Sequence, residues 1–434
     1  MSDQMFSIST IDGRYKKDIE ELQKYMSEYA LMETRYYVEL AYLEYITKLL
    51  VGEEYCVGSE FNTESYRKIK EIESVTNHDV KAVEYYIRSL INDDKIKEFV
   101  HFGLTSHDIN NVSNTINIRN CIDCVIHPIL NTLHNNILNL SEKYLHQPML
   151  SHTHGQPATP TTMGKEMYVF CYRLQKQLYM LDKFKYTCKF GGAVGSMNAH
   201  YIANNDINWI HELTIFINEL ELSRDIYTTQ LNSYDNLSEL LGIFLRISTI
   251  LIDFCQDLWL YISMDYFKLK IVSGEVGSST MPHKVNPIFF ENAEGNLGLA
   301  NSLIQHFQTK LPVSRLQRDL TDSTVIRNIG LIFGYILKAT KSILKGIDRL
   351  DINIDKINSD LNNNWSVVTE AIQTILRFNH YADSYDKLKE FSRNNKVTRE
   401  SLHNFIDTLD ITYDIKNKMK NITPHNYLGF LNVK

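Results

Sequence analysis

The side chains best suited to chemistry lie in GEVGSSTMPHKVNP, residues 274–287, which interrupts two long helical patterns. Its glycines and the serine pair Ser278-Ser279 favour a mobile loop, and two prolines fix the far end. A turn requires neither Lys284 nor Asn286, so we interpret the segment as a lid that closes over an anionic substrate rather than as a linker. The phosphate-binding pattern GxxxxGK[ST] is absent.

Two other polar segments stand where the pattern predicts that helices begin. Asn77, His78 and Asp79 belong to TNHD, in which Thr76 or Asn77 is expected to cap the helix. Thr105 and Ser106 belong to TSHD and begin the next long helix. Hydroxyls beside free backbone N–H groups suit a carboxylate or phosphate, but plain capping explains the same residues.

Histidine and arginine supply further candidates. His154 lies in SHTHGQPATP, which we expect to be a loop stiffened by Pro157 and Pro160, and imidazole suits a general acid or base near neutral pH. With His152 it could form a metal pair, but no further ligands stand at suitable spacing. Arg315, Arg318 and Arg327 are close enough in sequence to bind an anion, although a solvated, salt-bridged helix face is an equal alternative.

Charge and composition limit the classes of partner. The net charge of −7 argues against nucleic acid, which binds basic surfaces, but allows a locally basic pocket. No segment has the length and apolarity of a membrane span, and the first residues do not resemble a signal peptide, so we expect a cytoplasmic protein. Cys121 and Cys124 form a CxxC without a second pair, which favours helix cysteines over a metal or redox site.

Long segments without helix breakers predict an all-α protein with little β-structure. Proline is absent from three stretches, residues 1–127, 161–281 and 313–423. Apolar residues recur at steps of three and four from Ile122 to Tyr144, through Ile129 and past Pro128, where we expect a kink rather than an end. From Leu237 to Tyr261 they form a coiled-coil-like seam that requires neighbouring helices.

These patterns predict three parts. A long-helix bundle is expected in the middle of the chain, with a smaller helical domain before it and another after it. The expected bounds are 1–103 for the N-terminal domain, 104–346 for the bundle and 347–434 for the C-terminal domain.

The loop GSSTMPHKVNP resembles the signature of the fumarase/aspartase superfamily, roughly GSSxMPxKxNP. The rest of the sequence, from residue 11 to the C-terminal NYLGF, resembles the adenylosuccinate lyases, which belong to that superfamily. The segments that carry this resemblance are DGRY, TNHDVKAVEY, TSHDINN, THGQPATPTTMGKEM and KLPVSRLQRDLTDSTVIRN. The resemblance implies an all-helical homotetramer around a long-helix bundle, with each site built by loops of three subunits.

The implied activity is β-elimination of fumarate from adenylosuccinate, giving AMP, and from the succinyl-aminoimidazole carboxamide ribotide of purine synthesis. By resemblance Ser278 is the base and His154 the acid, with no metal or organic cofactor. His78 orients the substrate or shares its phosphate contact. The resemblance implies that the succinyl group is bound by Ser279, Lys284, Asn286, Thr105 and Ser106. It implies that the phosphate and ribose are bound by Arg14, Tyr15, Gln230, Arg318, Ser323 and Arg327. Further binding positions are Asn292, Asn77, Asp79, Val285, Thr324, Val325 and Ile326.

Two alternatives stay open. The chain could be a sister lyase with another succinyl substrate, such as an argininosuccinate-type enzyme, or a catalytically silent structural homologue. The phosphate set argues against the first, and the presence of Ser278, His154 and Lys284 argues against the second. His107, within TSHD, departs from the family pattern and receives no role.

Overall fold

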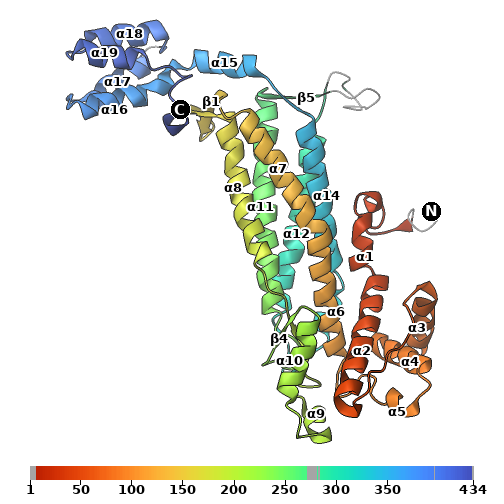
Figure 1. Cartoon of the computed structure of the whole chain (residues 1–434). Coiled ribbons are helices and arrows are strands. Elements are labelled where there is room, and N and C mark those ends of the chain that lie inside the picture. Colours follow the sequence, from red (N-terminus) through yellow and green to blue (C-terminus); the bar gives the residue numbers. More distant parts are fainter. Residues whose placement is uncertain (1–5, 271–280, 282–283, 395, 433–434) are drawn as a thin grey trace. The chain divides into compact units, whose positions relative to one another are not determined.

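The computed structural model describes residues 6–270, 281, 284–394 and 396–432, and these are mainly helical, as predicted (Figure 1). The helices of ten or more residues are α2 (Glu28–Val51), α3 (Thr63–Thr76), α4 (Asp79–Leu90), α6 (Ser106–Cys121), α7 (His127–Lys143), α8 (Met163–Asp182), α10 (Trp209–Glu219), α11 (Asp235–Ser263), α12 (Ile288–Lys310), α14 (Ile329–Asp348), α15 (Ile354–Asn363), α16 (Thr369–Phe378), α17 (Ser384–Asn394) and α18 (Arg399–Thr408). Among the described residues, none of the helices combines the length and apolarity needed to cross a bilayer.

Shorter turns connect these helices. The α-helical ones are α1 (Gln23–Met26), α5 (Asp94–Lys97), α9 (Asn198–Ala203), α13 (Thr321–Ile326) and α19 (Tyr413–Lys420). The 3₁₀ turns are η2 (Lys16–Asp18), η3 (Glu20–Leu22), η5 (Trp365–Val368) and η6 (Gly429–Asn432), and η4 (Ile122–Ile126) is a π-turn.

The expectation of little β-structure is confirmed, because the strands of the described residues form only three small two-stranded sheets. They pair β1 (Pro148–Thr153) with β2 (Gln156–Thr162), β3 (Thr187–Lys189) with β4 (Ser223–Asp225), and β5 (Phe267–Leu269) with β6 (Leu350–Ile352). The segment SHTHGQP, expected to be a loop, is the β1–β2 hairpin. Its prolines are tolerated because each strand of a two-stranded ribbon is an edge strand.

The chain divides into two compact units. Unit 1 comprises residues 1–131, 176–252 and 293–341, and unit 2 comprises residues 132–175, 253–292 and 342–434. The three-part division expected from the sequence, with bounds at residues 103 and 346, stays a prediction.

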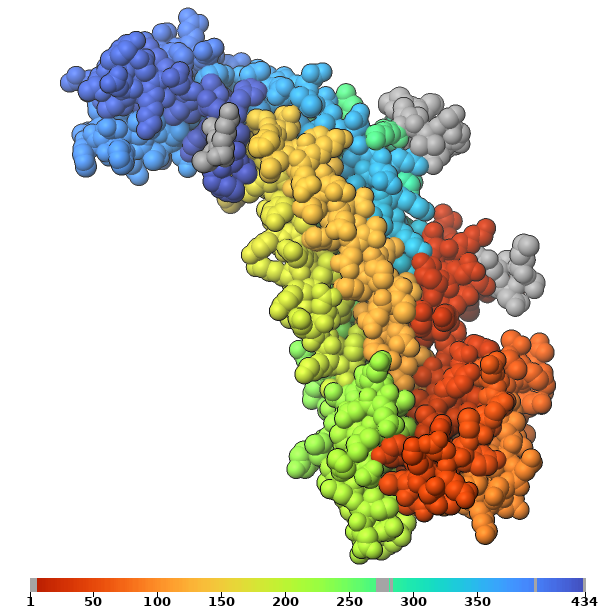
Figure 2. Space-filling model, in the orientation of Figure 1, coloured from red at the N-terminus to blue at the C-terminus, as the bar shows by residue number. Residues whose placement is uncertain are grey.

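In unit 1, helix α2 organises two hydrophobic cores. Ser27 caps its start by accepting a hydrogen bond from the Ala30 N–H at 3.1 Å, and Gly52, with φ of 80°, ends it in the left-handed conformation. Its buried Tyr36 faces the core of α3 and α4, and its buried Tyr42 faces the core around Trp209. Figure 2 shows α2 to α5, red to orange, as one closely packed mass.

The long helices bury the predicted seam. Leu240, Phe244, Ile247, Leu251, Phe254 and Leu258 of α11 are all buried. Within unit 1, the ring of Phe244 packs edge-on against that of Phe333 of α14, with the ring centroids 5.4 Å apart. Within unit 2, the ring centroids of Phe254 and of Phe170 of α8 are 5.3 Å apart. The seam therefore has the neighbouring helices that its pattern required.

The helical run from α6 into α7 passes through Pro128, as predicted, but the buried stripe shifts. The π-turn of η4 inserts one residue, and the His127 N–H bonds to the Ile122 carbonyl. Beyond this turn Leu130 is fully buried, whereas Ile129, placed in the stripe from the sequence, is only partly buried.

A buried ion pair joins α2 to the segment that precedes Thr105. The Nδ1 atom of His101 lies 2.6 Å from Oε1 of Glu39, whose side chain is fully buried. Burial opposes the charged imidazole, but the Glu39 carboxylate outweighs it and raises the pKa of His101 above its ordinary value. The Glu39 carboxylate therefore favours the protonated form of the buried His101 ring.

We expect this pair to stabilise the protein more at pH 6 than at pH 9. A raised folded-state pKa gives stability that is complete below the unfolded value of about 6.5 and is lost as pH rises through the folded value. Urea unfolding of the wild type and of His101→Gln should show a free-energy difference that shrinks with rising pH. A difference that stayed constant or grew would contradict the ion pair.

Candidate active site

A pocket of about 460 Å³ in unit 1 gathers many of the residues singled out from the sequence. It lies where the starts of α4 and α6 meet the α13 segment. The predicted residues that line it are Asn77, His78, Asp79, Thr105, Ser106, Arg318, Ser323, Ile326 and Arg327. Gln230 contacts this set from outside the lining, because its Oε1 accepts a hydrogen bond from Arg318 at 3.2 Å.

His78 both caps α4 and faces the pocket. The sequence suggested Thr76 or Asn77 as the cap, but Asn77, with φ of 52°, ends α3 in the left-handed conformation instead. The His78 Nδ1 accepts a hydrogen bond from the Lys81 N–H at 3.1 Å. Nδ1 must then be unprotonated, which places the proton of the neutral ring on Nε2, 3.4 Å from Oγ of Ser106. His78 is thus oriented as a hydrogen-bond donor beside a candidate succinyl-binding hydroxyl.

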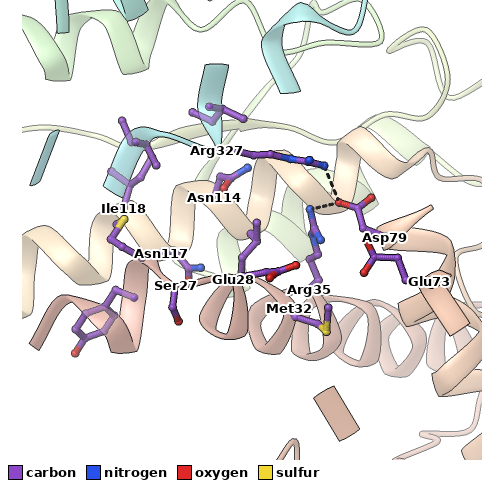
Figure 3. Close-up of a pocket in the computed structure, with 15 residues that line it drawn as sticks. Ser27, Glu28, Met32, Arg35, Glu73, Asp79, Asn114, Asn117, Ile118 and Arg327 are labelled. Carbon is purple, nitrogen blue, oxygen red and sulfur yellow. Dashed lines mark hydrogen bonds and ion pairs between the residues drawn. The ribbon is translucent and has the colours of Figure 1, made fainter. Parts of the chain in front are cut away.

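Asp79 is held by two arginines, as Figure 3 shows. Its Oδ2 lies 2.9 Å from the Arg35 guanidinium and 3.5 Å from that of Arg327. Burial would raise the pKa of the Asp79 carboxyl, but the charge of Arg35, the Val80 N–H and the charge of Arg327 together hold it below its usual range. Asp79 is therefore an anion in this pocket.

A second buried ion pair fixes the start of α6. Nζ of Lys189 lies 2.6 Å from Oδ1 of Asp108, and both side chains are fully buried. Asp108 also accepts hydrogen bonds from the backbone N–H groups of Thr105 at 2.8 Å and of Gly191 at 2.8 Å. Thr105 and Ser106 therefore stand on a helix terminus anchored from within the core.

His107 belongs to the wall of the pocket rather than to its reactive groups. Its Nε2 accepts a hydrogen bond from the Asn232 N–H at 3.3 Å, and its Nδ1 lies 3.7 Å from Oδ2 of Asp322. Burial, helped by the charges of Lys189 and Arg318, lowers the pKa of His107 to about 3. The ring is neutral, and Oδ2 of Asp322 also accepts a hydrogen bond from Tyr234 at 3.1 Å.

The candidate acid His154 lies in unit 2, at the tip of the β1–β2 hairpin. Thr153 pairs with Gln156, so His154 and Gly155 form a two-residue turn, with φ of 54° and 74°. Two successive left-handed residues define the hairpin turn in which Asn-Gly is usual. Histidine is, with Asn and Asp, one of the non-glycine residues that adopt this region most readily. Its side chain is exposed, as a proton donor to a ligand must be.

Other predicted residues lie outside this pocket. In unit 2, Lys284 is exposed, Val285 and Asn286 are partly exposed, and Asn292 accepts a hydrogen bond from Ser342 at 2.8 Å. Arg14 and Thr324 are exposed, Val325 is partly exposed, and Lys338 stands 5.0 Å above the ring of Tyr15. Ser278 and Ser279, with most of the expected lid, lie outside the described residues.

Sequence reasoning missed Arg35, Asn110, Asn114, Tyr234 and Asp322, which also line the pocket. Arg35 carried a signal, because a charged residue on the apolar stripe of a helix requires a buried partner. Among the described residues, no group of three or more His, Cys, Asp or Glu side chains is arranged to hold a metal ion.

Comparison with known proteins places the chain in a family. A family model described as Lyase matches residues 1–300, and one described as Adenylosuccinate lyase C-terminal matches residues 314–428. Adenylosuccinate lyase of Dictyostelium discoideum is 46% identical, covering 98% of this chain and 97% of its own. That of Escherichia coli K12 is 42% identical, covering 98% and 96%.

Solved structures agree on the fold. Fumarate lyase from Mesorhizobium sp. BNC1 matches with a TM-score of 0.76 at 13% identity, covering 95% of this chain and 96% of its own. The 3-carboxy-cis,cis-muconate lactonizing enzyme from Pseudomonas putida matches with a TM-score of 0.73 at 16% identity, covering 95% of each chain. With two family models and full-length relatives in agreement, the chain belongs to the adenylosuccinate lyases.

Proposed function

We propose that this lyase eliminates fumarate from adenylosuccinate, giving AMP, and from the succinyl-aminoimidazole carboxamide ribotide of purine synthesis. The observation that carries the proposal is the pocket that joins Arg318, Ser323 and Arg327 to the α6 terminus at Thr105 and Ser106. Arginine forks and hydroxyls suit a phosphate, and a helix N-terminus suits a carboxylate. A nucleotide that carries a succinyl group has both.

The elimination needs a base, an acid and donors for developing charge. We assign proton removal beside the substrate carboxylate to Ser278, whose alkoxide needs stabilisation by nearby N–H groups and cations. His154 protonates the leaving nitrogen of the purine base. Lys284, Ser279 and Asn286 hold the carboxylates, which carry more negative charge in the transition state than in the substrate.

The remaining assignments concern binding. His78 donates from Nε2 to the substrate. The residues Arg14, Tyr15, Gln230, Asn292, Asn77, Asp79, Val285, Thr324, Val325 and Ile326 complete the binding set by resemblance to the family. For Asp79, the two arginine contacts support a structural part in that set. The proposed reaction assigns no step to a metal or an organic cofactor.

The direct test is an ultraviolet assay of purified protein with adenylosuccinate. The spectrum should change to that of AMP, and fumarate should appear in equal amount. Argininosuccinate is the matched control, because it also releases fumarate but has no phosphate, and it should not react. Turnover of argininosuccinate alone would favour the sister lyase, and no turnover of either would favour the silent homologue.

We further propose a homotetramer whose sites are shared between subunits. Exposed aromatic and apolar side chains on the long helices support it, among them Tyr168, Tyr172 and Tyr179 of α8 and Trp259 of α11. Inactive Ser278→Ala and His154→Ala proteins should regain activity when mixed and reassociated. Random mixing gives about a quarter of the pockets both intact residues. Absence of recovery despite demonstrated subunit exchange would place both residues on one chain.

The cytoplasm is the proposed compartment. All six cysteines are free thiols, including Cys56 and Cys124, which are exposed. Free thiols of this kind are typical of a reducing compartment.

A further inference from the structure

Arg35 and Arg327 compete for one oxygen atom of Asp79. Both guanidinium groups contact Oδ2, Arg35 at 2.9 Å and Arg327 at 3.5 Å (Figure 3). All three side chains line the 460 Å³ pocket and also a neighbouring pocket of about 320 Å³. Asp79 therefore lies at the boundary of the two pockets, and its Oδ2 atom contacts two guanidinium cations.

The two arginines differ in their freedom. The Arg35 side chain is 8% exposed, lies in the first half of α2, and has a buried Nε without a hydrogen-bond partner in the described structure. The Arg327 side chain is 68% exposed and follows the last residue of the six-residue helix α13. Arg35 is fixed by its surroundings, whereas Arg327 can leave Asp79 by rotating its side chain into solvent or toward a ligand.

The charge balance explains why both arginines are present. Asp79 is ionised and 23% exposed, so a lone carboxylate there would attract the nearest cation strongly. With Arg35 in place, Asp79 remains neutralised when Arg327 moves away. Without Arg35, the release of Arg327 would leave a partly buried carboxylate with neither of these two cations, which is costly.

We propose that Arg35 is a positioning residue that keeps Arg327 available for the phosphate of the substrate. Arg35 neutralises Asp79 permanently, so that Asp79 guides Arg327 toward the pocket without retaining it when a phosphate arrives. A phosphate accepts two parallel hydrogen bonds from an arginine and so displaces the weaker 3.5 Å contact. This inference rests on the proposed function, in which Arg327 binds the phosphate.

The first test is the affinity for AMP, measured by calorimetry. Arg35→Met should weaken AMP binding about tenfold, within the range of coupling energies between neighbouring charged residues. Arg35→Lys, which retains the charge, should lie closer to the wild type. Arg119→Met is the matched control, because Arg119 is a partly buried arginine of unit 1 that lines neither pocket, and it should bind AMP normally. Equal AMP affinity in Arg35→Met and the wild type would overturn the proposal.

The second test separates positioning from general damage to the fold. In the double variant Arg35→Met/Asp79→Asn, no carboxylate at position 79 can retain Arg327 by charge, so its AMP affinity should match that of Asp79→Asn alone to within about twofold. Asp79→Asn alone, which keeps Arg35 and the shape of the carboxyl, is the reference for this comparison. If Arg35→Met weakened AMP binding in the Asp79→Asn background by the same factor as in the wild type, Arg35 would not act through Asp79 and the inference would be refuted.

A third variant distinguishes this inference from the proposed function. Arg327→Ala should weaken AMP binding, and in that background Arg35→Met should have no additional effect. If Arg327→Ala bound AMP normally, the phosphate assignment of the proposed function would be wrong. If Arg327→Ala weakened AMP binding but Arg35→Met weakened it further by the same factor as in the wild type, only the inference about Arg35 would fail.

Discussion

Replacement of His154 by alanine is expected to lower kcat by about 10²–10⁴, the range for loss of a general acid. The physical reason is that the nitrogen leaving the succinyl carbon is a poor leaving group until it is protonated. The Kd for AMP should change little, because Arg318 and Arg327, the proposed phosphate-binding residues, remain in place. Steady-state kinetics with adenylosuccinate, together with AMP titration, measures both quantities.

The hairpin itself supplies the control. His152 lies two residues earlier on β1, and its ring stands edge-on to Tyr266 with the centroids 6.4 Å apart. His152→Ala changes the same hairpin without touching the proposed acid and should keep most of the activity. Near-normal turnover by His154→Ala, or an equal loss in both variants, would remove His154 from its catalytic role. Ser278→Ala should lose activity to a similar extent as His154→Ala.

Replacement of Lys189 by methionine is expected to destabilise the protein by about 3–5 kcal/mol, the cost of breaking a buried ion pair from one side. The Asp108 carboxylate would keep its backbone donors but lose its only ion-pairing cation among the described residues. Because Asp108 also holds the Thr105 N–H, binding of fumarate should weaken along with stability. Urea unfolding and fumarate titration measure the two effects.

The matched control is a lysine with an exposed partner. Lys68 lies 3.9 Å from Glu64 on the surface of α3, and both side chains are more than half exposed. Lys68→Met should cost less than about 1 kcal/mol. The double variant Asp108→Asn/Lys189→Met should recover part of the loss, since the uncompensated charge is gone. If the Lys189 and Lys68 variants were equally stable, the buried pair would not hold this terminus.

Local signals in the sequence predicted most of the helical fold. The absence of proline and the steps of three and four from Leu237 to Tyr261 depend only on neighbouring residues, and α11 follows them. The start of α6 at Ser106 was predicted correctly for the same reason. The hairpin at His154 was missed because its prolines suit a loop and an edge strand equally well.

Pairing between distant residues could not be predicted. Asp108 and Lys189 are 81 positions apart, and Arg35 and Asp79 are 44 apart, so no periodicity connects them. The sequence of α2 did indicate that buried charged partners exist. Arg35 and Glu39 interrupt an apolar stripe at helical spacing, and both are buried against charged partners. The chemistry of such residues is visible in the sequence, but the identity of their partners is a property of the fold.

At the π-turn of η4 the chain could lose one residue without rotating the helix that follows relative to the helix that precedes. A residue inserted into or deleted from a regular α-helix turns everything beyond it by about 100°, because there are 3.6 residues per turn. A π-turn already holds one surplus residue, so losing the exposed Asp123 would restore α geometry and leave both neighbouring stripes facing their cores. The obstacle to that deletion is Pro128, whose ring would then meet a carbonyl four residues back in an unbroken helix. The surplus residue thus accommodates the proline, and we expect the deletion to be tolerated only if Pro128 is replaced as well.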